Sequence, residues 1–182
     1  PSILPGAVVV NADRSGNNYS FSGTGGIGGT ASLTKSGSST LTLGTANTYT
    51  GATAINGGTL QLNGSLTGTA ISVATGATLT ESGTGTIGGA ASLAVSGSAT
   101  LNGGNSYTGG TNVTSGGSVS INSATSLGAA SSQLTLDNGT LATTNAGLLT
   151  NGARVINIGS GGATININST GSAGTGQLFL NT

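Results

Sequence analysis

The stretch SGTGGIGGTASLTKSGSSTL, residues 22–41, reappears sixty residues later as SGTGTIGGAASLAVSGSATL, residues 82–101. The similarity continues beyond these two segments, because NTYTGATAINGGTLQLN, which starts at Asn47, resembles NSYTGGTNVTSGGSVSIN, which starts at Asn105. Two matches in the same order indicate that a long repeat, residues 22–63, is duplicated as residues 82–122. The duplication therefore indicates a fold that grows by the addition of similar repeats.

Short triplets of apolar, polar and apolar residues recur inside and beyond these repeats. The two aliphatic residues of a triplet are two positions apart, so a strand places both on one face and the polar residue on the other. The triplets are Leu41-Thr42-Leu43, Leu60-Gln61-Leu62, Ile71-Ser72-Val73, Val119-Ser120-Ile121 and Leu134-Thr135-Leu136. Each one predicts a short strand with one buried face.

The spacing of the triplets predicts how these strands are arranged. Many recur at about twenty residues, as from Leu43 to Leu62, which is typical of a solenoid. Pairs such as Gly57-Gly58 and Asn138-Gly139 lie between the strands and permit sharp turns. Asn-Gly pairs also suit two-residue hairpins, so an antiparallel meander is the alternative. Parallel stacking is favoured because near-identical strands then lie in register.

The prediction for the fold is an all-β chain with a single parallel β-helix, or β-solenoid. We expect roughly nine rungs of about 20 residues over residues 21–182, which would form a rod roughly 40 to 45 Å long. Residues 1–20 are predicted to be an N-terminal segment that includes a possible linking strand. No rung would be stable alone, because each buries too few aliphatic side chains to offset its ordering entropy.

The composition excludes several classes of function. Charged residues make up 3% of the chain and the formal net charge is zero, which argues against binding to nucleic acid or anionic membranes. The absence of Cys, Met, Trp and His excludes disulfides and soft metal sites. The longest apolar run, residues 7–10, is too short to cross a bilayer, so no membrane insertion is expected. Without a leading Met, the sequence is interpreted as mature or excised material.

Several segments resemble the passenger repeats of bacterial autotransporters. They are LTKSGSSTLTL (33–43), NTYTGATAINGGTLQL (47–62) and SLGAASSQLTLDNGTLATT (126–144), and the resemblance covers most of residues 33–182. It implies a right-handed parallel β-helix that is displayed on the outer membrane or released from it. It does not imply a ligand, because members of this family range from adhesins to biofilm matrix components.

Motifs that could carry chemistry are weak in this context. Residues 23–28 and 83–88 both spell G-x-G-x-x-G, but neither copy is followed by the helix and acidic residue that a dinucleotide site needs. Ser32 and Lys35 satisfy S-x-x-K, yet the second copy lacks the lysine, so Lys35 is expected to be a solvated surface residue. The glycines of residues 25–30 resemble a calcium-binding β-roll turn without its aspartate.

The three acidic residues do not predict a catalytic pair. Asp13, Glu81 and Asp137 are far apart in the sequence, and exposed surface charges are the expected outcome for all of them. No catalytic residue, cofactor or metal is therefore predicted.

Two tyrosines occupy matching positions in the two N-x-Y-T-G boxes. Tyr49 and Tyr107 are possible surface contacts for sugars or a partner protein. The favoured interpretation is structural, with each ring covering the neighbouring rung and its hydroxyl paired at the edge.

Apolar residues near the two ends are candidates for contacts between subunits, since we find no segment that would cap either end. They are Ile3, Leu4, Val8, Val9, Val10, Leu178, Phe179 and Leu180. The expected partner is another copy of the chain, stacked end to end, or flanking repeats of a longer chain.

The function expected from the sequence is a non-enzymatic structural component of a bacterial surface or extracellular matrix. Such a component would assemble head to tail into fibres or form a rigid autotransporter stalk. The alternative is an adhesin module that binds glycans or neighbouring cells, and a polysaccharide-cleaving enzyme ranks last. The expected location is extracellular or on the outer surface of a bacterium.

Overall fold

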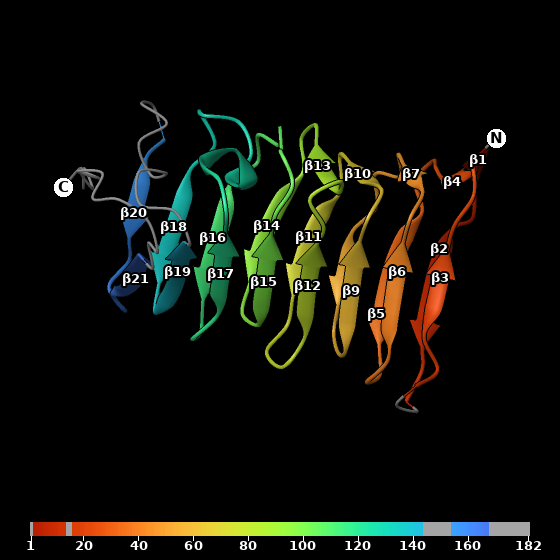
Figure 1. Ribbon diagram of the computed structural model, residues 1–182, viewed down its shortest axis with the longest axis horizontal. Coiled ribbons are helices and arrows are strands. Elements are labelled where there is room, and N and C mark those ends of the chain that lie inside the picture. The colour runs from red at the N-terminus through yellow and green to blue at the C-terminus, as the bar shows by residue number, and fades with distance from the viewer. Residues whose placement is uncertain (1, 14–15, 144–153, 168–182) are drawn as a thin grey trace.

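The computed structural model describes residues 2–13, 16–143 and 154–167 and shows a parallel β-solenoid (Figure 1). Its strands lie in two long sheets of eight strands each and in short pairings along a third side. All strand pairings within the described residues are parallel, so the solenoid prediction is confirmed and the antiparallel alternative is wrong. No helix in this part of the chain is long and apolar enough to span a membrane.

The first long sheet contains one strand from each successive turn. In spatial order its strands are β2 (Ala7–Asn11), β5 (Ser32–Ser36), β8 (Thr53–Ile55), β11 (Ala70–Val73), β14 (Ser92–Val95), β16 (Thr111–Thr114), β18 (Leu134–Asp137) and β20 (Ile156–Ile158). The second long sheet follows the same order with β3 (Tyr19–Phe21), β6 (Thr40–Leu43), β9 (Thr59–Leu62), β12 (Thr78–Glu81), β15 (Ser98–Leu101), β17 (Ser118–Ile121), β19 (Gly139–Thr143) and β21 (Ala163–Ile167).

The third side is narrower and less regular than the two long sheets. It contains β1 (Ser2–Ile3) paired with β4 (Gly26–Ile27), and a three-stranded sheet of β7 (Ala46–Asn47), β10 (Ser65–Thr67) and β13 (Thr86–Gly88). A 3-10 turn, η1 (Ala124–Leu127), lies further along the chain, where Ser123 caps it by accepting a hydrogen bond from the Thr125 backbone N–H.

The number and length of the turns differ from the prediction. The structure has about seven turns of about 22 residues, against the nine of 20 that were expected. Partner residues in the first long sheet are 18 residues apart between Thr53 and Ile71, but 25 apart between Val8 and Leu33. The connecting loops therefore vary in length while the strands keep their register.

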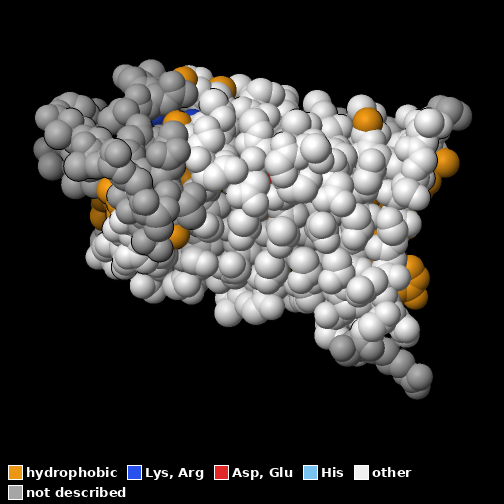
Figure 2. Space-filling view, viewed as in Figure 1, with side chains coloured by type: hydrophobic (Ala, Val, Ile, Leu, Met, Phe, Trp, Pro, Cys, Tyr) orange, Lys and Arg blue, Asp and Glu red, His pale blue; other side chains and the backbone are white. Residues whose placement is uncertain are grey.

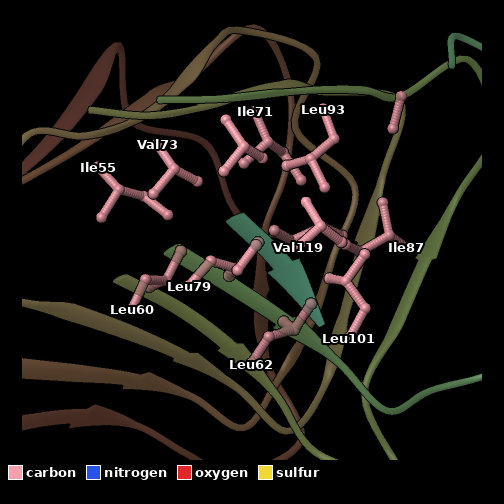
Figure 3. Close-up of a cluster of buried hydrophobic side chains, with 14 of the residues drawn as sticks. Ile55, Leu60, Leu62, Ile71, Val73, Leu79, Ile87, Leu93, Leu101 and Val119 are labelled. Carbon is pink, nitrogen blue, oxygen red and sulfur yellow. The ribbon is translucent and has the colours of Figure 1, made fainter. Parts of the chain in front are cut away.

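The register places like residues above one another in columns that face the interior. In the second long sheet, Leu41, Leu60 and Leu79 form one column, and each is fully buried. All five predicted triplets show the expected alternation of buried and less buried residues. The side chains of the two long sheets meet in a continuous aliphatic core (Figure 3). Each buried aliphatic side chain contributes about 1.5 to 3 kcal/mol, so the stack supplies the stability that one turn lacks.

The N-terminal residues belong to the first turn of the solenoid. β2 pairs in parallel with β5 over five residues, from Ala7 opposite Ser32 to Asn11 opposite Ser36. The segment predicted as a linking strand is therefore folded onto the chain's own second turn. The other edge of β2 has no strand partner among the described residues.

Candidate functional site

The N-x-Y-T-G box, residues 47–51, lies where the third side of the solenoid turns into the first long sheet. Asn47 is fully buried, and its Oδ1 accepts a hydrogen bond from the Ile27 backbone N–H one turn earlier, at 3.0 Å. Its Nδ2 donates to the Ser65 backbone oxygen one turn later, at 3.2 Å. The side chain therefore joins three successive turns.

The second box, residues 105–109, repeats this arrangement. Asn105 is 6% exposed and accepts from the Ile87 backbone N–H at 2.6 Å through Oδ1. Its Nδ2 donates to the Ser126 backbone oxygen at 2.8 Å. The two copies thus place the same amide in the same role, which explains why the box needs asparagine at its first position.

The tyrosines of the two boxes point into the core. Tyr49 is 1% exposed and Tyr107 is 0% exposed, so the prediction of surface aromatic contacts is wrong. Each hydroxyl pairs with the threonine four residues later, Tyr49 with Thr53 at 2.7 Å and Tyr107 with Thr111 at 2.6 Å. Burial raises the pKa of each tyrosine to about 12. These rings have the structural role that the sequence analysis favoured.

The last residue of each box has to be glycine because the turns approach closely there. A Cβ on Gly51 would lie 2.3 Å from the backbone oxygen of Ala31, and one on Gly109 would lie 2.6 Å from that of Ala91. Both distances are too short for a real side chain, so the neighbouring turns could not pack as they do.

The two tyrosines give a matched pair of variants with different expected costs. In Tyr107→Phe the Thr111 hydroxyl loses the one side-chain partner that it has among the described residues, and we expect a loss of about 1 to 3 kcal/mol of unfolding free energy. In Tyr49→Phe the Thr53 hydroxyl keeps Thr69 at 3.0 Å, so the loss should be smaller, about 1 kcal/mol or less. Urea titrations followed by circular dichroism would measure both, and equal losses would contradict this assignment.

Both N-x-Y-T-G boxes lie in segments that match a known protein-family model. Residues 33–62 and 96–121 match the passenger-associated-transport-repeat model, and each match contains one complete box. The chain carries two passenger-associated transport repeats. These repeats occur in autotransporters and imply a secreted or surface-exposed passenger domain, as the resemblance of the sequence indicated. No curated protein and no solved structure matches the chain.

The first passenger repeat contains a buried lysine. Lys35 occupies an inner column of the first long sheet between Val10 and Ile55, and it is 0% exposed. Its Nζ donates to the backbone oxygens of Ser36, Gly37 and Gly57 at 2.8, 3.1 and 3.1 Å. Burial lowers the pKa of Lys35, and the charge of Asp13 opposes this shift. The prediction of a solvated lysine is wrong.

A buried carboxyl group lies between the two passenger repeats. Glu81 occupies an inner column of the second long sheet between Leu62 and Leu101, and it is 0% exposed. Its Oε2 accepts from the Gly103 N–H at 3.1 Å and from Asn105 Nδ2 at 3.0 Å, while Oε1 has no partner in the described part of the chain. Burial raises the pKa of Glu81 to about 7, although both hydrogen bonds act in the opposite direction.

The acidic residues lie in three different environments. Asp13 is exposed, as predicted, whereas the prediction of an exposed charge is wrong for Glu81. Asp137 is half-buried and accepts a hydrogen bond from the Gly161 N–H at 2.6 Å. The described residues contain no group of three His, Cys, Asp or Glu that could hold a metal ion.

The glycine-rich motifs form strands and turns. Residues 26–27 of the first copy are β4 and residues 86–88 of the second are β13, so neither copy leads into a helix. This is the outcome expected from the sequence, and it leaves no helix N-terminus for a phosphate at either position.

Arg154 follows the second passenger repeat and anchors a loop that the sequence analysis did not single out. Its guanidinium donates to the backbone oxygens of Leu127 and Ser132, both at 2.8 Å, and to those of Gly128 and Ala124 at 3.0 and 3.2 Å. Desolvation lowers the pKa of Arg154, and Tyr107 acts in the opposite direction. One side chain thereby fixes η1 and the loop after it.

The apolar residues near the N-terminus are divided between surface and interior. Ile3, Leu4 and Val9 are 64%, 74% and 67% exposed, whereas Val8 is half-buried and Val10 is 9% exposed. Apolar side chains are visible at this end of an otherwise largely polar surface (Figure 2, right). The other predicted contacts, Leu178, Phe179 and Leu180, lie outside the described residues.

Proposed function

We propose that the chain is a non-enzymatic structural segment of a secreted or surface-exposed passenger, and that it acts as a stiff rod. The supporting observation is the pair of eight-stranded parallel ladders, whose inner columns continue from turn to turn without a change of register. In a solenoid each turn packs on its neighbours, so length can be added turn by turn while the cross-section stays the same. The N-x-Y-T-G boxes add side-chain links between those turns.

The first turn presents a surface that suits a further turn. β2 and β3 are edge strands whose outer edges have no partner among the described residues. Beside them lies a cavity of about 480 Å³ lined by Ile3, Pro5, Val8, Phe21 and Ile27, with other residues. Unpaired strand edges beside an open apolar core favour the addition of another parallel rung. We propose that this rung comes from a second copy of the chain, stacked head to tail.

Negative-stain electron microscopy at high protein concentration would test this stacking. We expect filaments in the wild type and isolated short rods in Val8→Lys, because Val8 faces the open core and a lysine there would bring a charge to the contact. Val9→Lys is the matched control, since Val9 lies on the same strand with 67% of its surface exposed and should leave filaments intact. Short rods in the wild type would contradict self-assembly and favour a rod whose further turns belong to a longer chain.

The adhesin alternative remains a prediction, with glycans or neighbouring cells as the expected ligands. Tyr49 and Tyr107 are buried, so neither ring can support it by stacking on a sugar. Binding of the wild-type chain to a glycan array would favour an adhesin over a purely structural rod.

A further inference from the structure

The outer face of the second long sheet carries an ordered array of hydroxyl groups. Each strand from β6 to β19 has two outward positions, two residues apart, and the register aligns them into two rows. The first row is Thr40, Thr59, Thr78, Ser98, Ser118 and Thr140, and the second is Thr42, Gln61, Thr80, Thr100, Ser120 and Ala142. Ten of the twelve positions thus carry a hydroxyl, seven of them from threonine. We name this surface the threonine face.

The hydroxyls of the threonine face are available to an external ligand. Within the residues that the structure describes, none of the ten makes a hydrogen bond to another protein group. Hydroxyls elsewhere are commonly paired, as in Thr69 with the Gly51 backbone oxygen at 2.7 Å or Ser132 with that of Tyr107. The side chains of this face are half-buried or exposed, so their free donors and acceptors face solvent.

The array has two regular repeats. Neighbouring strands of a sheet are about 4.8 Å apart, and positions i and i+2 of one strand are roughly 6.6 Å apart. Threonine restricts the χ1 angle, so successive hydroxyls and methyl groups repeat with little variation. The first repeat is close to the oxygen–oxygen repeat along the a axis of hexagonal ice, and the second is somewhat shorter than the repeat along the c axis. A rigid face with this spacing can hold water molecules at lattice positions.

The surroundings of the face favour water over other ligands. None of the twelve positions is charged or aromatic, and the buried Lys35 and Glu81 cannot contribute a surface charge there. A sugar-binding face would be expected to offer a ring for stacking, and a protein interface would be expected to offer large apolar anchors. The outer positions of the first long sheet, such as Ala54, Ser72 and Asn112, are mixed and form no comparable array.

We infer that the threonine face binds ice. Each hydroxyl would share one water molecule with the crystal and contribute little alone, but ten fixed contacts act together because the solenoid holds them in register. The methyl groups between the hydroxyls would leave fewer competing hydration sites. This inference is independent of the proposed head-to-tail stacking, because the face lies along the rod and not at its end.

Ice recrystallisation and thermal hysteresis, measured on the full chain, would test the inference. We expect wild-type protein to slow recrystallisation and to lower the freezing point below the melting point. Thr80 lies near the centre of the face, so Thr80→Tyr should reduce the hysteresis by about tenfold by holding the face away from the lattice. Ser72→Tyr is the matched control, because Ser72 lies on the outside of the first long sheet at the same level and should retain full activity.

Three outcomes would overturn the inference. One is wild-type activity no greater than that of an unrelated globular protein at equal mass concentration. Another is an equal loss in Thr80→Tyr and Ser72→Tyr when circular dichroism and melting temperature show that both variants are folded. A third is retention of the chain on an insoluble polysaccharide without any effect on ice, which would assign the face to the adhesin alternative.

Discussion

Replacing Lys35 with alanine should lower the free energy of unfolding by about 3 to 5 kcal/mol, which is large for a single residue of a solenoid. The substitution removes all three hydrogen bonds from Nζ and leaves the backbone oxygens of Ser36, Gly37 and Gly57 without that donor. It also opens a cavity in the inner column between Val10 and Ile55. Urea-induced unfolding followed by circular dichroism would measure the loss.

Two further variants separate the causes of that loss. Lys35→Met refills most of the cavity but cannot donate, so its stability should lie between those of the wild type and Lys35→Ala. Thr34→Ala is the surface control, because Thr34 faces outward from the same strand and should change the unfolding free energy by about 0.5 kcal/mol or less. A loss in Lys35→Ala as small as that of the control would mean that the amine is solvated, as the sequence analysis expected.

The sequence does contain the signal that places Lys35 inside. Leu33 and Lys35 alternate with polar residues, as the two aliphatic residues of a triplet do, and the second copy of the long repeat has Val95 at the position of Lys35. Lysine is so seldom buried that the general expectation for the residue type outweighed this periodicity. The sequence could not predict the three backbone oxygens that accept hydrogen bonds from Nζ and so stabilise the buried amine. Those oxygens come from two adjacent turns, so their positions depend on how the turns pack.

The strands were more predictable than the loops. Alternation within a triplet needs only the geometry of one strand, so each predicted triplet has its aliphatic residues buried. The number of turns depends on loops of unequal length. The average spacing of a few triplets is shorter than the true average turn, so it predicted too many turns. The bridging role of Asn47 was not predictable for the same reason. Its partners, Ile27 and Ser65, come from the turns on either side.

Glu81 should make the stability of the protein depend on pH, with the folded state losing stability as the pH rises. The pKa of this carboxyl is about 7 in the folded chain, against 4.5 for the ordinary side chain, because burial favours the neutral form. Between these two values the folded state binds more protons than the unfolded state, so the free energy of unfolding falls as protons are removed. A difference of this size corresponds to about 3 kcal/mol, fully present below about pH 4.5 and lost by about pH 7.

The geometry agrees with a neutral carboxyl under acidic conditions. Both donors, the Gly103 N–H and Asn105 Nδ2, contact Oε2, so Oε1 is left to carry the proton. The ionised form would bury a charge in an aliphatic column, and no cation forms a hydrogen bond with it in the described residues. Glu81 in turn raises the pKa of Tyr107, whose phenol stays neutral because its pKa is about 12. Among the described residues, only burial and the two hydrogen bonds shift the pKa of Glu81, so no opposite charge there offsets its ionised form.

Glu81→Gln tests this assignment without a large change in shape. We expect urea titrations from about pH 4 to about pH 8 to show a fall of about 3 kcal/mol in the wild type and a nearly flat profile in the variant. Asp13→Asn is the matched control, because Asp13 is an exposed carboxylate and its removal should leave the fall in place. A profile that stays sloped in Glu81→Gln would show that another group binds the proton. A flat profile in the wild type would mean that the folded chain accommodates the Glu81 carboxylate by opening this part of the core to water.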